Sequence, residues 1–578
     1  ARLELPRRTV FIDIRDQSHI HISGLAFRFG NTDHWYDRWW NIDDVEPAGV
    51  KALGNCRDIH VTHCRFEYLP RAVMFRSIHP GGLMSDITIA DNDIRYTDYG
   101  AMDIAQGSGR EPPVGKLTRV RILRNRLHEI GHRPARARHG HAIRLGFASI
   151  AELAGNVLHR TYGAGLFLFG AKGGGQRHVV PLSRVLVHHN KVTYPLLRTN
   201  DWGGIETWQS GPFYVFNNVS GNPGGYWHSR HIARKDPEKR GHTSARFGFA
   251  YYLDGGFKNY LFNNIAWGQS SDLTSRLTSS VALQEIIGFM NAFFNNTFYR
   301  FGAGMRRQAP MAGRAYYLGN IMQDMGEFYV RHAHPRDTPT EANAADEYAA
   351  GDPEAEVYDY PTLAYARNVF QGGPRDFGLF EHIGRVYPTL DAFRDALEQR
   401  RALATSVGTV ADQPPLAGAP NHDFRPAEDS AAIDHGVKFF VPWSLSAVVG
   451  EWNFYLHDRF PQRILGENWY MTDEYYHRSM YRFVPLRDLR AINVTAESYG
   501  AGPLEDWVRG ALTFNGTAQY CVMTHEEMIA DYAFSGGDRQ RRLDGSYAGA
   551  DRQTLDMDVN SFVIELYLRS EPGHAPCG

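Results

Sequence analysis

One short phrase recurs along most of this chain and constrains its fold more than any other feature. The phrase is an apolar residue, any residue, an apolar residue, two further residues, an asparagine, any residue and an apolar residue. Clear copies span 87–94, 120–127 and 185–192, and two earlier copies, at 20–27 and 59–66, lack the asparagine. Looser copies surround Asn156, Asn218, Asn264, Asn296, Asn320 and Asn368. Recurrence of this kind indicates a repeat architecture.

The copies recur at intervals centred on about 30 residues, and apolar residues alternate within each copy. Alternation predicts short β-strands, because successive side chains of a strand point to opposite faces. We therefore predict coils of short strands stacked on equivalent strands, with the asparagines of successive coils bonded in a ladder. We also expect each asparagine to take the left-handed backbone conformation that a sharp corner needs. The long interval between Asn218 and Asn264 predicts a loop that projects from the stack.

This arrangement resembles the right-handed parallel β-helix family, the pectate-lyase-like superfamily, over residues 9–440. The resemblance implies an all-β fold built as a right-handed parallel β-helix solenoid. The segment 423–436 resembles the final coil of secreted, polysaccharide-acting members of the family. The resemblance therefore implies a carbohydrate-active enzyme that is secreted, periplasmic or held at the cell surface.

We expect the solenoid to occupy residues 1–440, with an exposed insertion at 331–357 and a short amphipathic helix at 389–401. Residues 441–500 are rich in aromatic side chains and are expected to form a linker packed on the solenoid. Residues 501–578 resemble part of a laminin-G/concanavalin-like β-sandwich. A small C-terminal β-rich region is therefore expected.

Composition excludes several classes of protein. The 578 residues carry a formal net charge of −2, so no strong field favours nucleic acid or an anionic membrane surface. No apolar run of about 18 residues occurs, so we expect no transmembrane helix. Residues 1–8 lack the regions of a signal peptide, as expected of a mature or trimmed chain. The 4 cysteines do not make a disulfide scaffold, and a bond between Cys56 and Cys64 stays open.

Stacking brings residues that are far apart in the sequence onto one face, because equivalent positions on successive coils lie about 4.8 Å apart. We aligned the strands that follow small-residue turns, and one outward-facing row results. That row reads Asp103, Arg144, Phe167, Glu206 and Tyr252. The alignment predicts a groove along this face, although a slip of one residue would turn the row toward the core.

Three carboxyl groups gather on this face. Asp254 lies one coil across and two residues along from Glu206, about 8 Å away by strand geometry, and Asp201 lies nearby in the sequence. Glycoside hydrolysis needs one protonated and one ionised carboxyl, about 5–5.5 Å apart for retention and about 6.5–9.5 Å apart for inversion. The separation fits either outcome. We predict Glu206 and Asp254 as acid and base or nucleophile, with Asp201 tuning or replacing one of them.

Aromatic and polar side chains around these carboxyls are candidates for sugar contacts. Aromatic faces stack on sugar rings and raise a carboxyl pKa by excluding water. The predicted substrate-binding residues are Trp202, Trp208, Tyr252, Arg144, His141, Asp103 and Trp35. Two of them have a second interpretation, since Asp103 and Arg144 form a plausible structural ion pair. The loop that carries Trp35 either overhangs the groove or caps the end of the stack.

A second group of residues is basic, namely His128, His132, His139, His141, Arg144, Lys172 and Arg177. His139 and His141 would share a strand face, but no carboxylate or cysteine spacing completes a metal site. We therefore predict no metal and no cofactor. The chain also lacks a P-loop, a Rossmann glycine fingerprint, an HExxH motif and a GxSxG motif in a strand–turn–helix context.

Three functions compete on these residues. The leading hypothesis is a glycoside hydrolase acting on a complex polysaccharide or on oligosaccharides. The alternative enzyme is a polysaccharide lyase, which needs a cation to neutralise a uronate and a base such as Arg144, His141 or Lys172. The third is a non-catalytic glycan-binding surface protein. No nucleic acid partner is expected, and the sugar, the linkage and the oligomeric state stay open.

Overall fold

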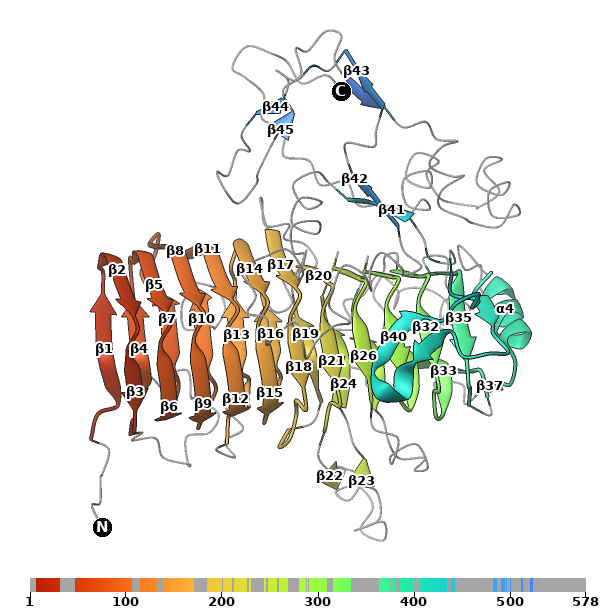
Figure 1. Ribbon diagram of the computed structural model, residues 1–578, viewed down its shortest axis with the longest axis horizontal. Helices are drawn as coiled ribbons and strands as arrows, with labels where there is room; N and C mark the ends of the chain where they lie inside the picture. Colours follow the sequence, from red (N-terminus) through yellow and green to blue (C-terminus); the bar gives the residue numbers. More distant parts are fainter. Residues whose placement is uncertain are drawn as a thin grey trace, which may run out of the picture.

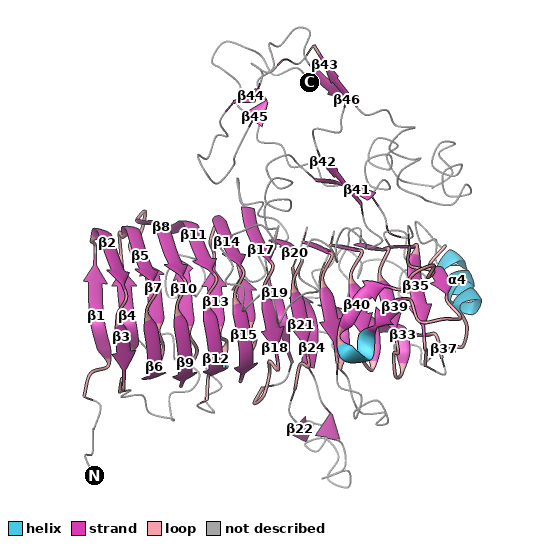
Figure 2. Ribbon diagram, viewed as in Figure 1, coloured by secondary structure: helices cyan, strands magenta, loops and turns pink. Residues whose placement is uncertain are grey.

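The computed structural model shows a long stack of β-coils that follow one another in sequence order along the long axis of the molecule (Figure 1). Figure 2 shows strands throughout the stack and, among the described residues, an α-helix at its C-terminal end. The described residues are 7–31, 47–106, 115–132, 140–170, 184–199, 201–209, 211, 213–225, 228–229, 244–245, 248–256, 259–268, 280–286, 288, 291–308, 315–333, 363–374, 376–380, 385–399, 406–433, 436, 438–441, 482–485, 490–493, 495, 499–500, 511–512 and 520–522.

Each coil contributes one strand to each of three sheets. Sheet A contains β1 (Val10–Arg15), β4 (Ala48–Leu53), β7 (Val73–Ser77), β10 (Met102–Gln106), β13 (Ile143–Gly146), β16 (Leu166–Phe169), β19 (Trp202–Trp208), β24 (Gly248–Asp254), β27 (Val281–Ile286), β30 (Ala303–Gln308), β33 (Phe328–Ala333), β36 (Gly378–Phe380) and β37 (Arg385–Tyr387). All pairs in this sheet are parallel except the last, in which β36 and β37 run antiparallel.

The other two sheets repeat the same order. Sheet B contains β2 (Ser18–Ser23), β5 (Arg57–Thr62), β8 (Leu83–Ala90), β11 (Lys116–Leu123), β14 (Ile150–Ala154), β17 (Arg184–His188), β20 (Phe213–Phe216), β25 (Tyr260–Phe262), β28 (Ala292–Phe294), β31 (Ala315–Leu318) and β34 (Leu363–Ala366). Sheet C contains β3 (Ala26–Arg28), β6 (Arg65–Leu69), β9 (Asp93–Thr97), β12 (Arg126–Ile130), β15 (Val157–Thr161), β18 (Lys191–Thr193), β21 (Val219–Gly221), β26 (Ile265–Trp267), β29 (Thr297–Tyr299), β32 (Ile321–Gln323), β35 (Asn368–Gln371) and β38 (Gly408–Val410).

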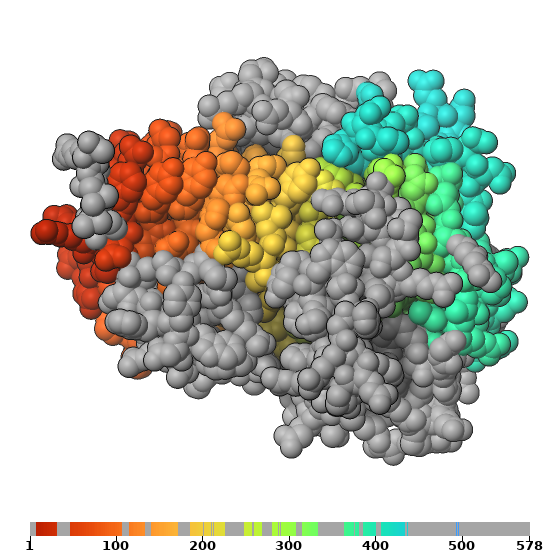
Figure 3. Space-filling view, turned by 90° about the horizontal axis from the view of Figure 1, so that it is seen from below, coloured from red at the N-terminus to blue at the C-terminus, as the bar shows by residue number. Residues whose placement is uncertain are grey.

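Parallel neighbours in one sheet require a crossover through the other two, and such crossovers are right-handed in nearly all proteins. The fold is a right-handed parallel β-helix, which confirms the predicted fold class. Figure 3 shows the coils side by side along the long surface, in the colour order of the sequence. The long interval between Asn218 and Asn264 holds a projecting hairpin of β22 (His228–Ser229) and β23 (Ser244–Ala245), as predicted (Figure 1).

The asparagine ladder is present along most of the stack. Each ladder asparagine except the last donates an Nδ2 hydrogen bond to the Oδ1 of the next, at 2.9–3.1 Å. The members are Asn92, Asn125, Asn156, Asn190, Asn218, Asn264, Asn296, Asn320 and Asn368. All of them are buried at the corner between sheets B and C. The ladder confirms the sequence prediction of lateral asparagine contacts.

The backbone conformation predicted for these asparagines is wrong. The residue before each ladder asparagine takes the left-handed conformation, with φ between 53° and 68°. These residues are Asp91, Arg124, Gly155, His189, Asn217, Asn263, Asn295, Gly319 and Arg367. The left-handed residue turns the chain at the corner, so the following side chain points inward. The asparagine can then bond to the coils on both sides of it.

The interior of the solenoid is filled by the inward-facing residues of the three sheets. One inward row of sheet A contains Val50, Val73, Met102, Ile143 and Leu166, each at most 1% exposed. The thiols of Cys56 and Cys64 are buried and free, so no disulfide joins them. Burial raises the pKa of both thiols, which keeps them protonated.

The C-terminal end of the stack is covered by helix α4 (Leu390–Gln399), where we expected an amphipathic helix (Figure 1). Phe393 of α4 is fully buried and packs against Phe377, Phe380 and Tyr387 at ring distances of 5.5–6.0 Å. The helix therefore shields the last core layer from water. Among the described helices, none is long and apolar enough to cross a bilayer.

The segment 423–436 is not a final coil. β39 (Leu416–Gly418), the short helix η9 (Ala419–Asn421) and β40 (Asp423–Pro426) form an antiparallel hairpin outside the three sheets. Phe424 of this hairpin stacks on Trp267 of β26, with ring centroids 5.4 Å apart. The chain therefore folds back onto sheet C after β38, because Trp267 offers it an aromatic surface.

Little of the predicted C-terminal region lies among the described residues. Two pairs of strands precede or enter it, β41 (Lys438–Val441) with β42 (Arg482–Pro485), and β44 (Tyr499–Gly500) with β45 (Ala511–Leu512). A third pair joins β43 (Arg490–Ile492) to β46 (Tyr520–Val522). Residues 331–333 of the predicted insertion belong to β33 instead. The rest of the insertion, most of the linker and most of the predicted sandwich lie outside the described residues.

Candidate active site

The residues predicted to share one outward row on sheet A do share it. Parallel pairing gives the row Asp103, Arg144, Phe167, Glu206 and Tyr252. The row continues toward the C-terminal end through Gln284, Arg306 and Arg331. The predicted register is therefore confirmed for this part of sheet A.

The row is buried, in contrast to the groove predicted from the sequence. Glu206 is 0% exposed and Tyr252 is 4% exposed. Partly exposed residues flank Glu206 along the chain and on the next coil, namely Asp201, Trp202, Trp208 and Asp254. A ligand that reaches Glu206 from this side would meet these four residues first.

Glu206 is held in an unusual electrostatic state. The Gly203 backbone N–H donates a hydrogen bond to Glu206 Oε2 at 2.8 Å, while Oε1 is buried and has no hydrogen-bond partner among the described residues. Burial raises the pKa of Glu206 well above the usual carboxyl range, and the charges of Asp254 and Asp201 raise it further against the opposing effect of the Gly203 bond. The site therefore favours the protonated form of Glu206 over the carboxylate.

Asp201 occupies the turn before β19, in a left-handed conformation with φ 64°. The residue as a whole is exposed, yet protein atoms packed around its carboxyl raise its pKa to about 6. The positive charge of Arg306 and a hydrogen bond from the Tyr252 hydroxyl oppose this rise. Burial and the three nearby carboxylates raise the pKa of Tyr252, so its hydroxyl stays protonated.

Asp254 ends β24 and is the lateral partner of Trp208. It therefore lies one strand across and two residues along from Glu206, and the spacing of strands and residues puts their backbones about 8 Å apart. This is the diagonal relation predicted from the sequence. Asp254 acts electrostatically on both Glu206 and Tyr252, so the predicted carboxyl residues form one cluster.

An aromatic group adjoins this cluster on the side toward the N-terminus. Trp202 contacts Phe167 edge-on at 5.3 Å and His141 at 4.8 Å, and Trp208 lies 6.0 Å from Phe167. His141 stacks on Phe167, and its Nδ1 accepts a hydrogen bond from the Ala164 N–H at 3.0 Å. The proton of the neutral imidazole therefore lies on Nε2. The two tryptophans are packed against sheet A and keep part of their surface exposed.

Asp103 lies among arginines, as the ion-pair interpretation of Asp103 and Arg144 predicts. Asp103 Oδ1 accepts a hydrogen bond from Arg144 Nη1 at 2.8 Å, and Arg76 pairs with Oδ2. Arg71 is 3.9 Å from the same oxygen, and Arg144 also lies over the ring of Phe169 at 4.0 Å. Asp103 is 3% exposed, so this network is buried and organises the early coils.

Replacing Asp103 with asparagine should lower the free energy of unfolding by about 3 kcal/mol, because buried guanidinium groups would lose their counter-charge. The midpoint of urea unfolding, followed by circular dichroism, measures the effect. Asp93→Asn is the matched control, since Asp93 pairs with Arg95 at a partly exposed site and should change stability by less than about 1 kcal/mol. Equal effects of the two variants would contradict the structural role of Asp103.

The predicted basic cluster does not form one group. His128 lies on β12 of sheet C beside His159, whereas His141 and Arg144 lie at sheet A. The reason is geometric, since the chain turns a corner between these residues. Trp35, His139, Lys172 and Arg177 lie outside the described residues.

The structure adds residues that our alignment of the repeated strands did not single out. Arg306 approaches Asp201 and Tyr252 and donates a hydrogen bond to Gln284 at 3.3 Å. Its place could have been found by continuing the row through β27 and β30. Glu285, a further carboxyl on β27, pairs laterally with Leu253 in an inward row. It is bonded there to the Tyr317 hydroxyl and Arg307, so it belongs to the core.

Comparisons with known proteins do not assign a function to this site. No family model matches the chain, and no curated protein matches it. One similar solved structure is titled as the crystal structure of the periplasmic alginate epimerase AlgG, with 11% sequence identity and a TM-score of 0.31. The alignment covers 58% of this chain and 76% of that chain. The fold assignment rests on the strand pairing described above.

Proposed function

We propose that the chain is a glycoside hydrolase that cleaves a polysaccharide at the Glu206 cluster. The observation that carries the proposal is the buried Glu206 with a raised pKa, whose Oε1 has no hydrogen-bond partner in the described part of the chain, beside two further carboxyl groups. Glycoside hydrolysis uses a protonated carboxyl to donate to the leaving oxygen and an ionised carboxyl on the opposite side of the sugar. The cluster supplies both kinds of group.

The roles follow from the surroundings of each carboxyl. Glu206 is the general acid, because burial raises its pKa and so favours the form that carries the proton. Asp254 is partly exposed at the end of β24, so water and the sugar can reach it, and it takes the role of base or nucleophile. The charge of Asp201 modulates Glu206 and Asp254, and Tyr252 and Arg306 interact with the Asp201 carboxyl. Trp202 and Trp208 offer aromatic surface beside the carboxyls for stacking on sugar rings.

Elimination at the same site is less well supported. The base of a lyase must be deprotonated near neutral pH, and Tyr252 has a raised pKa that prevents this. Arg144 is engaged by Asp103, and His141 already accepts a backbone hydrogen bond at Nδ1. Arg144 and His141, the described candidates for the base of a lyase, are therefore both engaged in structural contacts.

The experiment is a digestion of a panel of neutral and acidic polysaccharides by the full chain. The hydrolase proposal expects new reducing ends without the ultraviolet absorbance of an unsaturated product. Unsaturated ends would favour a lyase instead, and retention of a glycan without any cleavage would favour a binding protein. Nuclear magnetic resonance of the first product then gives the anomeric outcome, retention or inversion.

Asp201→Asn should shift the basic limb of the pH–rate profile toward lower pH. The pKa of Asp201 is about 6, so its negative charge is present above that pH. This charge raises the pKa of Glu206, and its removal lets Glu206 lose the catalytic proton at a lower pH. Steady-state kcat/KM across the pH range measures the shift. Asp13→Asn is the control on the same outward row, six strands away from β19, and an equal shift in that variant would contradict the local effect.

A further inference from the structure

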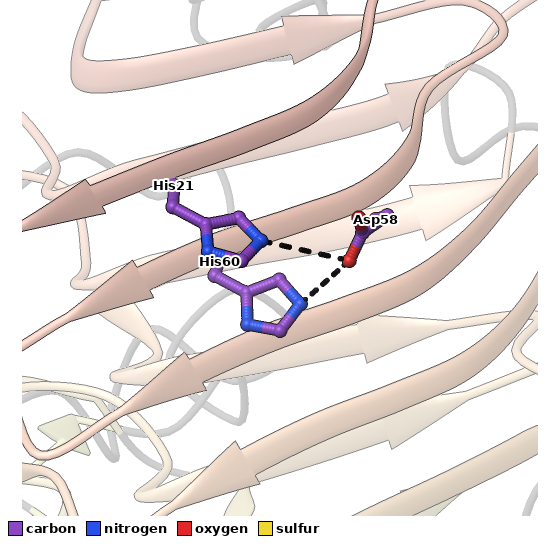
Figure 4. Close-up of side chains that lie close together, drawn as sticks. All are labelled: His21, Asp58 and His60. Atoms are coloured by element: carbon purple, nitrogen blue, oxygen red, sulfur yellow. Dashed lines mark hydrogen bonds and ion pairs between the residues drawn. The ribbon is translucent and has the colours of Figure 1, made fainter.

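Three possible metal ligands lie together on the outer face of sheet B, near the N-terminal end of the stack (Figure 4). His21 of β2 and His60 of β5 are lateral partners, and their rings stack with centroids 4.1 Å apart. Asp58 Oδ1 lies 2.8 Å from His60 Nε2 and 3.7 Å from His21 Nε2. One ligand atom from each residue lies within 4.8 Å of the other two.

The local backbone supports this arrangement. Asp58 has a left-handed conformation with φ 56°, which aspartate adopts more readily than most residues. His19 takes the equivalent position on β2, with φ 61°. The Nδ1 of His19 is 2.8 Å from Asp58 Oδ2, so the second carboxylate oxygen is held away from the two stacked rings. Metal-binding carboxylates are commonly oriented by such an outer partner.

The donor atoms are those of a transition-metal site. Two imidazole nitrogens and a carboxylate oxygen suit Zn²⁺ and its neighbours Cu²⁺ and Ni²⁺. Ligands about 2.0–2.1 Å from a tetrahedral ion lie about 3.3 Å from one another. The separations of 2.8 Å and 3.7 Å bracket that value, so small side-chain rotations would admit an ion.

Exposure of the cluster leaves room for water ligands. The side chain of His21 is 61% exposed, and those of His60 and Asp58 are 33% exposed. Without a metal, the same contacts are surface ion pairs of little energetic value. Without a metal, the contacts among these four polar side chains therefore contribute little to stability.

We propose that His21, Asp58 and His60 bind one divalent transition-metal ion of the zinc class, with His19 orienting the carboxylate. The ion joins β2 to β5 and so fastens the first coil of the described stack to the second. The site lies on sheet B, apart from the carboxyl cluster of sheet A, and its existence does not depend on the proposed hydrolase activity. The sequence search missed it because it examined histidines close in sequence, whereas His21 and His60 meet only through coil stacking.

Calorimetric titration of the full chain with zinc chloride tests the proposal, after removal of any histidine tag and treatment with a chelator. We expect one equivalent to bind, and His60→Ala and Asp58→Asn each to weaken binding at least about tenfold. His63→Asn is the matched control, since His63 is an exposed histidine of the same coil with φ 55°, which asparagine tolerates. This variant should bind zinc as the natural chain does.

Two further measurements separate binding from loss of fold. Hydrogen exchange should show slower amide exchange in β2 and β5 when zinc is present, because a bound ligand stabilises the segments that hold it. His21→Gln changes a mostly exposed side chain, so it gives a second test if His60→Ala does not fold. Absence of zinc uptake by the folded natural chain, or equal affinity in His21→Gln, His60→Ala and Asp58→Asn, would overturn the proposal.

Discussion

Replacing Glu206 with glutamine should lower kcat by about 10²–10⁴-fold and make the protein more stable at neutral pH. The first effect arises because an amide cannot donate a proton to the leaving oxygen. The second arises because Glu206 is buried with one oxygen unbonded, so the carboxylate form is costly to the fold. Opposite signs for activity and stability are expected where a site is built for chemistry.

The pH dependence sharpens this prediction. The pKa of Glu206 is raised in the folded protein, so the native state binds a proton that the unfolded chain has lost. Stability of the natural chain therefore falls as pH rises above the ordinary carboxyl range, and continues to fall up to the raised pKa. Glu206→Gln removes this loss. Its stabilising effect should be large at pH 8 and vanish in acid, where the carboxyl is protonated in both states.

Thermal unfolding at several pH values and assays on the cleaved polysaccharide measure the two effects together. Asp254→Asn is the companion variant, and it should lose turnover with a smaller change in stability because Asp254 is partly exposed. A Glu206→Gln protein that keeps its turnover would remove the acid from the mechanism. A variant that is destabilised at pH 8 would show instead that Glu206 is a structural carboxylate.

Replacing Asn190 with alanine should cost about 3–6 kcal/mol of unfolding free energy. Asn190 donates to Asn218 Oδ1 at 3.0 Å and to the Leu153 carbonyl at 2.9 Å. Its Oδ1 accepts from both the side chain and the backbone N–H of Asn156. Alanine leaves buried donors of Asn156 and the Leu153 carbonyl without partners, and unsatisfied buried groups cost about 1–3 kcal/mol each.

Urea unfolding followed by circular dichroism measures this cost, and hydrogen exchange locates it. The backbone amides of the coils near Asn156 and Asn218 should exchange faster in the variant than in the natural chain. Asn421→Ala is the control, because Asn421 is an exposed residue of η9 and should change stability by no more than about 0.5 kcal/mol. A loss of less than about 1 kcal/mol for Asn190→Ala would mean that the ladder contributes little.

The outward row of sheet A shows how much can be predicted from the alternation of apolar and polar residues in the sequence. Because a strand has a period of two, apolar neighbours fix which residues face the core, and Glu206 was assigned outward on that ground. The same rule applied through β30 would have placed Arg306. It would also have turned Glu285 inward, since Glu285 stands next to the outward Gln284 in the row. Both residues were open to prediction from the sequence.

The chemical state of the site was not open to prediction in this way. Burial of Glu206, the missing partner of its Oε1 and the hydrogen bond from Gly203 depend on how surrounding segments pack. The left-handed residue before each ladder asparagine is another example, because a corner needs one such residue but its place depends on which side chain must point inward. The partners of Asp103 likewise come from the coils on both sides of it, Arg71 and Arg76 from the β7 coil and Arg144 from β13.

The sequence by itself determined the coil repeat, the asparagine ladder and the row in which Glu206 stands, because these follow from a local period that every coil repeats. Only the tertiary structure decided what each member of the row experiences. Lateral stacking at about 4.8 Å brings together His21 and His60, or Asp201 and Arg306, across large gaps in the chain. Burial and charge act through space, so the pKa of a carboxyl and the grouping of metal ligands depend on neighbours that no local pattern specifies.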